Sequence, residues 1–500
     1  MARGRQFHRQ YQLETRRAFL TSIPHRSPLV VPLSPPIIGH NRRVRRWIGA
    51  FVAVVFSCIP IFLARSSSPN LLRDTDTHVL LDAIRERNAP FSWFVGDWPL
   101  QNHFYRPIST LAFEVDNRLY GANAAGYGLT NALLCIACVL MLFWFLRELT
   151  DLPLLAGASA CLFALQHTEY QFLLLTPIYY FALLTAIFGI IRHRLVVKLW
   201  LPACLVLLYS ILELAGMDSL GSGSIGGGTI DWLPGRTATV MTVFALAAMA
   251  AYARFERTSA GRFEKSPTAL DPPATRSKKM DAKPARAAFA LPVASLLCIA
   301  FAFGSYEQAV MLPGAMLAVA VTMRVRGYRV RWGWQVGFWL ILVGYLVLRK
   351  MVIPPGASGY QLQQFRKGPG VAISLFDYSM PFVNGIKGFL TDLEGGPIML
   401  MTAAPYGFIL TAAENLTAFY QARRRWTFAL AGYGISIIAF LPMAWVKQFP
   451  HYNYWPMALR SLFAVTLLWV GIELAVIAWS PRGRQAPQRL DPAPGSLPRR

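Results

Sequence analysis

Apolar runs of about 20 residues alternate with short arginine-bearing loops, and this alternation constrains the 500-residue chain more than any other feature. A helix needs roughly 20 apolar residues to cross the hydrocarbon core of a bilayer, where every backbone polar group must be satisfied internally. We therefore expect an all-α integral membrane protein with about 12 transmembrane helices and a large first outer loop that carries interfacial helices. The expected spans are 47–64, 126–146, 152–167, 171–191, 196–215, 236–253, 287–304, 308–323, 332–348, 397–413, 427–446 and 457–479.

The composition supports a membrane protein. Apolar residues make up 54% of the chain and charged residues only 15%, whereas soluble domains carry about 25% charged residues. Lys and Arg nevertheless exceed Asp and Glu by 49 − 25 = 24. Most of this excess falls in loops that the alternation places on one side, which the positive-inside rule assigns to the cytoplasm. Because these charges flank spans, we expect no nucleic-acid partner.

The predicted spans and their charges divide the chain into five parts. A multi-pass protein with both termini in the cytoplasm is expected, as in a bacterial inner membrane. The linker has nine basic and four acidic residues, whereas the first outer loop has five basic and seven acidic ones. The parts are a basic cytoplasmic tail (1–46), an N-terminal membrane half (47–253) with outer loop 66–125, a cytoplasmic linker (254–286), a C-terminal membrane half (287–479) with outer loop 349–396, and a cytoplasmic tail (480–500).

All six cysteines lie inside apolar runs, where a free thiol behaves as a small buried hydrophobe. The pair Cys135-x-x-Cys138 has the spacing of a redox or metal motif, but it lies in the middle of a predicted span. Without a second pair or a nearby histidine, this spacing favours a structural role. No metal site is therefore expected.

The first outer loop concentrates groups that could carry chemistry. Asp74 and Asp76 stand about ten residues beyond the first span, and Arg106 follows an aromatic stretch at 91–98. Carboxylates beside arginine and aromatic residues at a membrane surface suit an amphiphilic substrate with an anionic head group. The competing interpretation is that these carboxylates only solvate a loop, and that Arg106 pairs with Glu114 or Asp116.

Five short motifs give the chain a resemblance to a known family. They are YRPIS at 105–109 followed by GYGLTNALL at 126–134, LFALQHTE at 162–169, SYEQAVMLP at 305–313, YLVLR at 345–349 and YNYWP at 452–456. Together they resemble, in the same order, recurrent stretches of the polytopic GT-C glycosyltransferases, which include the protein O-mannosyltransferases and their bacterial relatives. Tyr306 stands where that pattern has a lysine, and 162–169 lacks its proline.

The resemblance implies a GT-C-like fold and a transfer of sugar from a polyprenyl-phosphate carrier to an acceptor at the outer face. An acidic residue early in the first outer loop would be the base, which points to Asp76 or Asp74. Cations must hold the leaving phosphate; the alternative role of Arg349 is snorkelling at the interface. The candidates for binding substrate or phosphate are Arg106, Arg349, Lys350, Tyr105, His103, His167, Glu169 and Glu307.

The resemblance indicates some binding partners and leaves the acceptor open. Membrane lipid and a lipid-linked sugar are expected, with no permanently bound cofactor, while the acceptor could be a glycan, a lipid or a protein. The sequence does not decide the sugar or a need for a divalent cation. Two other functions fit a chain of this kind: a twelve-span transporter or lipid flippase, and a non-catalytic scaffold of the cell envelope. The tyrosine at 306 favours the scaffold, whereas the lack of an obvious internal repeat disfavours the transporter.

The predicted topology can be tested by substituted-cysteine labelling. In a cysteine-free background, Ser68→Cys should react with an impermeant maleimide added outside intact cells, because it follows the first span. Ser277→Cys lies in the predicted cytoplasmic linker and should react only after permeabilisation. Labelling of both positions from the same side would contradict the alternation of loops.

Overall fold

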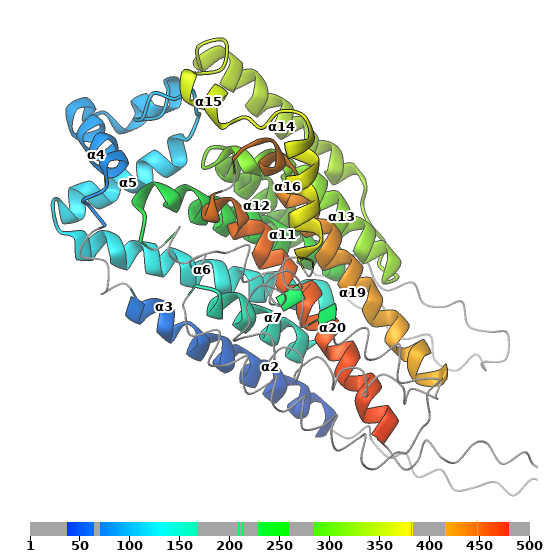
Figure 1. Ribbon diagram of the computed structural model, residues 1–500. Helices are drawn as coiled ribbons and strands as arrows, with labels where there is room; N and C mark the ends of the chain where they lie inside the picture. The colour runs from blue at the N-terminus through cyan, green and yellow to red at the C-terminus, as the bar shows by residue number, and fades with distance from the viewer. Residues whose placement is uncertain are drawn as a thin grey trace, which may run out of the picture. The chain divides into compact units, whose positions relative to one another are not determined.

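We describe the protein from a computed structural model, covering residues 38–64, 71–167, 209–210, 213–214, 229, 231–259, 285–381, 383, 416–447 and 449–479. Every regular element in these residues is a helix, and the one isolated β-bridge that they contain joins Phe365 and Val446. The helices run largely alongside one another (Figure 1). The described part of the chain thus confirms the predicted all-α class.

Ten α-helices among the described residues lie in or overlap the predicted spans. Six stretches among the described residues are long and apolar enough to cross a membrane: Val44–Leu63, Ala124–Thr150, Leu233–Thr258, Glu307–Val325, Gly333–Val352 and Arg425–Trp445. These stretches define a multi-pass membrane protein. The helices are α2 (Ile38–Ser57), α3 (Ile59–Ala64), α6 (Ala124–Thr150), α7 (Pro153–Leu165), α11 (Arg236–Ser259), α12 (Ala285–Phe303), α13 (Leu312–Val325), α14 (Gly333–Val352), α19 (Leu416–Phe440) and α20 (Tyr454–Trp479).

The number of spans stays a prediction. Predicted spans 171–191 and 397–413, and nearly all of 196–215, lie outside the described residues, as do the C-terminal tail and most of the N-terminal tail and the linker. Helix α7 has 13 residues, or about 20 Å at the rise of an α-helix, and is short for a bilayer core of about 30 Å.

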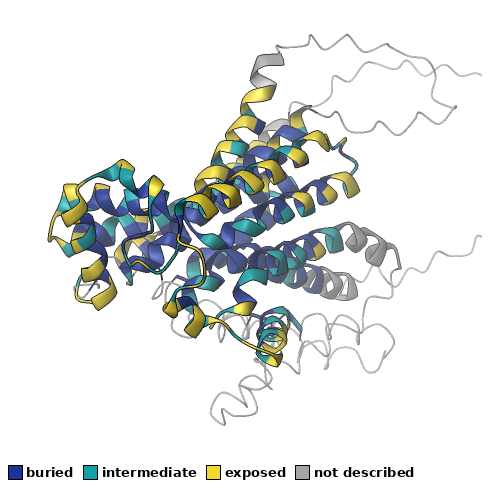
Figure 2. Cartoon of the chain, turned by 90° about the horizontal axis from the view of Figure 1, so that it is seen from above, coloured by how far each residue is buried: buried dark blue, intermediate teal, exposed yellow. Residues whose placement is uncertain are grey.

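The outward faces of two helices explain why this fold needs a lipid environment. On α14, Val336, Leu340, Val343 and Val347 are all more than half exposed. Their spacing of three and four residues places them on one face of the helix. Helix α2 exposes Ile48, Val52 and Phe56 in the same way, and exposed residues follow the outer faces of the helices (Figure 2). Faces of this kind on a soluble monomer would aggregate.

Small residues let the interior helices approach closely. Helix α19 packs along α20, and a Cβ added to Gly432 would lie 2.7 Å from the backbone nitrogen of Phe463. Helix α11 buries a run of alanines that includes Ala245, Ala248 and Ala250. Close packing between small residues is how membrane helices associate when lipid offers no hydrophobic driving force.

Residues 71–121 fold into short helices around an apolar cluster that also includes Tyr127 and Leu233. Helices α4 (Thr75–Arg87), η2 (Pro90–Val95) and α5 (Pro107–Tyr120) bury Leu80, Ile84, Trp93 and Phe113 together. A buried ion pair joins this segment to the bundle: Nη1 of Arg236 lies 2.6 Å from Oδ2 of Asp116. We call this end of the bundle the loop end.

Six further short helices are described. They are η3 (Leu233–Gly235), η4 (Glu307–Met311), α15 (Gly359–Gln364), α16 (Pro369–Ser379), η5 (Leu441–Trp445) and η6 (Pro450–Asn453). Backbone hydrogen bonds pair the two loops beside α15 and η5, because Arg366 N donates to Trp445 O and Lys447 N donates to Gln364 O.

At the other end of the bundle, three of the predicted cytoplasmic loops meet. Arg257 Nη2 lies 2.6 Å from the buried carboxylate of Glu148. Arg326 donates to the carbonyl oxygens of Leu149 and Thr150, and the backbone of Arg331 donates to Glu256. Three of the loops to which the alternation assigns one side therefore share one end of the helices.

The buried ion pair at the loop end gives a prediction about stability. Arg236 is fully buried, and it also donates to Asn131 Oδ1 (2.6 Å) and to the carbonyl of Tyr127 (3.1 Å). Arg236→Gln leaves the Asp116 carboxylate buried without its partner, which should destabilise the protein by about 3–5 kcal/mol. The thermal unfolding midpoint in detergent, followed by circular dichroism, measures the loss.

A matched control removes an exposed ion pair of the same segment. Asp82 lies 3.0 Å from Arg85, and both side chains are solvated. Asp82→Asn should change the stability by less than about 1 kcal/mol. Equal midpoints for the two variants would show that the buried pair does not hold the segment on the bundle.

Candidate active site

The two candidate carboxylates at the start of α4 have different environments. Asp74 is the N-cap of this helix: its Oδ2 accepts from Thr77 N at 3.3 Å and from Trp232 Nε1 at 3.1 Å. Asp76 follows in the first turn, and its side chain lines a cavity of about 440 Å³. An aspartate at an N-cap satisfies backbone donors, so Asp74 positions the helix while Asp76 faces the cavity.

Arg106 is the buried cation of the site. Its Nε and Nη2 atoms donate to Glu307 Oε2 at 2.9 and 2.7 Å. Three aromatic rings surround the guanidinium, with centroids 4.2, 4.8 and 4.7 Å from its carbon: Phe104, Trp98 and Tyr306. Cation–π contacts of this kind strengthen when the site is desolvated. The charge of Arg106 is thus held in one place by an ion pair and an aromatic cage.

A close approach of two backbones brings Arg106 to Glu307. Ile108 N donates to Gly304 O at 2.9 Å, and Ser109 Oγ donates to Ser305 O at 2.9 Å. A Cβ on Gly304 would lie 2.8 Å from Cγ1 of Ile108, so only glycine fits there. The start of α5 is therefore fixed on the turn that follows α12.

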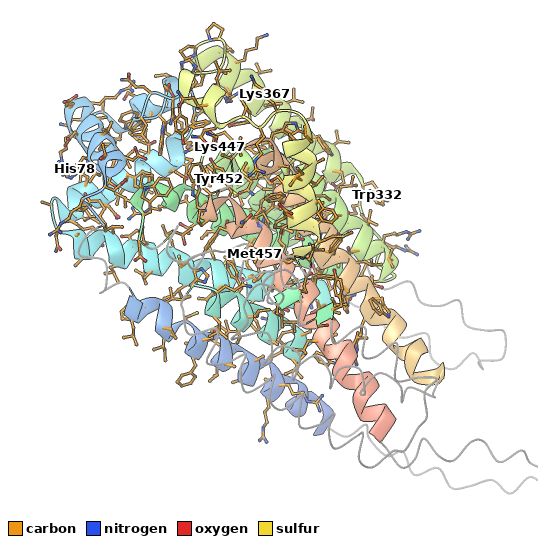
Figure 3. All side chains as sticks on the ribbon, in the orientation of Figure 1. His78, Trp332, Lys367, Lys447, Tyr452 and Met457 are labelled. Atoms are coloured by element: carbon orange, nitrogen blue, oxygen red, sulfur yellow. The ribbon has the colours of Figure 1, made fainter. Side chains whose placement is uncertain are left out.

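Two adjoining cavities meet at Arg106. The first, of about 440 Å³, has Asp76, Asn102, Trp232 and His451 in its wall. The second, of about 270 Å³, has Glu307 and Arg349 together with an apolar wall. Both cavities are lined by Phe104, Arg106, Tyr306, Tyr360, Gln364 and Tyr452; Tyr452 is labelled in Figure 3.

The charges of the site act on one another. Partial desolvation raises the pKa of Asp76, which is otherwise exposed, and the neighbouring charge of Asp74 raises it further. Burial also raises the pKa of Tyr360, on which the charges of Arg106 and Asp76 act in opposite directions. The carboxylate and the guanidinium therefore influence the same hydroxyl group from within one site.

Hydrogen bonds at Arg349 and His103 join the predicted outer loop 349–396 to the predicted outer loop 66–125. The carbonyl oxygen of His103 accepts from Arg349 Nη2 at 3.3 Å and from Gln361 Nε2 at 3.1 Å. Ser358 Oγ donates to Asn102 O at 3.0 Å, and Nδ1 of His103 lies 3.2 Å from Gly356 O. Arg349 lines the second cavity, while His103 lines neither of the two.

Other candidates from the sequence lie away from the two cavities. Tyr105 donates its hydroxyl to Phe94 O at 3.0 Å. His167 is buried in the bundle, where its Nε2 lies 2.7 Å from the hydroxyl of Tyr454. Lys350 is exposed at the end of α14 and lines neither cavity, and Glu169 lies outside the described residues.

The sequence-based alternative for Arg106 does not occur. Glu114 pairs with Arg118 and accepts from Trp93 Nε1, and Asp116 pairs with Arg236. Cys135 and Cys138 are both fully buried, and the described residues contain no group of three or more His, Cys, Asp or Glu side chains that could hold a metal ion.

Several residues of the site could not be singled out from the sequence. Trp232, Tyr360 and His451 come from loops that are far apart along the chain. Tyr306 and Tyr452 belong to motifs of the family resemblance, and this was the only signal that could have pointed to them. Aromatic residues near membrane interfaces are common, so their type alone does not predict a shared cavity.

Comparison with family models, with curated proteins and with solved structures gave no match to this chain. The functional argument therefore depends on the site itself and on the motifs.

Proposed function

We propose that this protein is a membrane glycosyltransferase that moves a sugar from a polyprenyl-phosphate carrier to an acceptor at the outer face of the membrane. The observation that carries the proposal is the pair of adjoining cavities at the loop end, which join Asp76 to the Arg106–Glu307 pair and Arg349. A carboxylate and fixed guanidinium groups around adjoining cavities are what a transfer from phosphate requires.

The residues can be given roles in that reaction. The acceptor hydroxyl oxygen forms a bond to the anomeric carbon, and its proton passes to the carboxylate of Asp76. The bond between that carbon and the phosphate oxygen breaks, and the electron pair leaves with the phosphate. Arg106 and Arg349 line the second cavity and would stabilise the growing negative charge there.

The second cavity also suits the lipid part of such a donor. Val310, Leu346, Met443 and Val446 form its apolar wall. Leu346 is 47% exposed on α14, the helix with the extensive outward apolar face. A prenyl chain could therefore pass from the bilayer along α14 to the arginines, which places the phosphate at the membrane surface.

The departure from the family pattern at Tyr306 is compatible with this role. Its ring lies 4.7 Å from the guanidinium carbon of Arg106, so the position that has lysine in the pattern here supports a neighbouring cation. A transporter would need a site near the bilayer midplane, whereas the two cavities lie at the ends of the helices. We place the enzyme in a bacterial inner membrane, with the loop end outside and an acceptor of the cell envelope.

The role of Asp76 gives the first test of this proposal. Asp76→Asn removes the base while keeping the size of the side chain, and it should lower the transfer rate by about 10²- to 10⁴-fold. The rate is measured in proteoliposomes as release of polyprenyl phosphate from polyprenyl-phosphate hexoses, with envelope lipids and glycans as acceptors. Asp82→Asn, on the solvated side of the same helix, should keep the full rate. Full activity of Asp76→Asn would remove the proposed base.

The pKa of Asp76 gives a second test. The base must be ionised, so the rate should fall as the pH decreases through the raised pKa of Asp76. Asp74→Asn can still cap α4 and accept from Trp232, but it removes the charge that raises this pKa. The acid limb of its pH–rate profile should therefore shift to lower pH, with less than about a tenfold change in the maximal rate. An unchanged limb would contradict the coupling of the two carboxylates.

A further inference from the structure

His451 is a buried histidine of the first cavity whose ring nitrogens have no hydrogen-bond partner among the described residues. It lies in η6, its residue is only 7% exposed, and it lines the cavity together with Asp76. The described residues make no hydrogen bond to either imidazole nitrogen. Because the ring lies at a cavity wall, its nitrogens can form hydrogen bonds with a group that enters the cavity.

Aromatic packing fixes the orientation of this ring. The centroid of His451 lies 5.0 Å from that of Trp232 and 4.4 Å from that of Tyr452. Trp232 is itself held by the hydrogen bond from its Nε1 to Asp74. The imidazole therefore shares a rigid frame with the start of α4, where Asp76 is located.

The imidazole is uncharged at neutral pH. Burial lowers the pKa of His451 to about 3, and the nearby charge of Arg106 also acts in this direction. A neutral imidazole has one donor and one acceptor nitrogen, which suits a hydroxyl group better than a phosphate. Asn102 has a buried Oδ1 atom in the same cavity, also without a partner among the described residues.

We propose that His451 recognises the uncharged, hydroxyl-bearing part of the substrate, and that its imidazole forms a hydrogen bond with a sugar hydroxyl in the cavity that also contains Asp76. This inference rests on the proposed function and assigns the two cavities different duties. The first cavity takes the sugar, and the second takes the prenyl phosphate at Arg106 and Arg349.

Binding of two kinds of probe, measured without turnover, tests whether the first cavity takes the sugar and the second takes the prenyl phosphate. Farnesyl phosphate lacks a sugar, whereas farnesyl phosphates bearing mannose, glucose or galactose report what the sugar adds to the affinity. In wild-type protein in nanodiscs, at least one hexose-bearing probe should bind more tightly than farnesyl phosphate by calorimetry. His451→Phe keeps the aromatic packing and should weaken that probe by about fivefold to tenfold, the effect of one lost hydrogen bond. Its Kd for farnesyl phosphate should stay within about twofold.

Matched variants separate recognition from packing. His451→Gln keeps a hydrogen-bonding side chain and should recover part of the affinity for the hexose-bearing probe. His78, an exposed histidine of α4 that lies apart from Tyr452 in Figure 3, provides the control His78→Gln, which should leave both affinities unchanged. Arg349→Gln should weaken both kinds of probe, because both carry the phosphate.

The outcomes distinguish a failure of the role assigned to His451 from a failure of the proposed function. If His451→Phe lowers the affinity for both probes equally, the ring has only a packing role. If it lowers neither affinity, the ring contacts no more than a bridging water. Either result overturns the proposed recognition of the sugar. So does a wild-type protein that binds farnesyl phosphate but gains nothing from any hexose. A wild-type protein that does not bind farnesyl phosphate would instead contradict the proposed function.

Discussion

The ion pair between Arg106 and Glu307 is the interaction on which the arrangement of the site depends. It connects residues 201 positions apart in the sequence, and thereby joins the helices of 71–121 to the start of η4. An ion pair alone repays little of the desolvation of its two charges. Here the aromatic cage and the backbone contact at Gly304 fix the same geometry, so the guanidinium has one position from which it lines both cavities.

Buried charges elsewhere in the bundle illustrate the difference between a structural pair and a candidate site. Arg236 with Asp116 and Arg460 with Glu213 are enclosed on all sides, and Arg236 also satisfies oxygens of α6. Arg106 is nearly as buried, yet it borders open volume on two sides. Burial and pairing therefore do not identify a functional arginine; the adjoining space does.

The helical architecture was predictable from the sequence because its cause is local. Each span must satisfy its backbone within one helix and show apolar side chains to lipid. Hydropathy therefore placed the ends of the six long apolar stretches to within five positions, although α2 and α19 begin nine and eleven residues before the predicted spans. The charge pattern also grouped three loops that meet at one end of the helices, while their orientation in the membrane stays a prediction. The total of twelve spans depends also on segments outside the described residues and stays a prediction.

The site was predictable only in part. Asp76 and Arg106 were singled out from the first outer loop, and both line the first cavity. The partner of Arg106 was sought nearby, at Glu114 or Asp116, but ion pairing depends on the fold and not on sequence separation. Asp74 and Asp76 could not be told apart, because their roles depend on the residue at which α4 begins. His451 and Trp232 were missed, since no local pattern reports which distant loops meet.

The different environments of the two aspartates explain how one short segment can serve both the structure and the proposed chemistry. Asp74 accepts two hydrogen bonds, which orient the helix and the ring of Trp232. That ring packs against His451 in η6, which directly precedes α20. A base must lie within hydrogen-bond reach of the proton that it removes, and this requires the substrate and the carboxylate to be held by one frame. The contacts from Asp74 to Trp232 and from Trp232 to His451 link the two sides of the first cavity. They would hold a substrate bound at His451 in a fixed position relative to Asp76, which is two residues from Asp74.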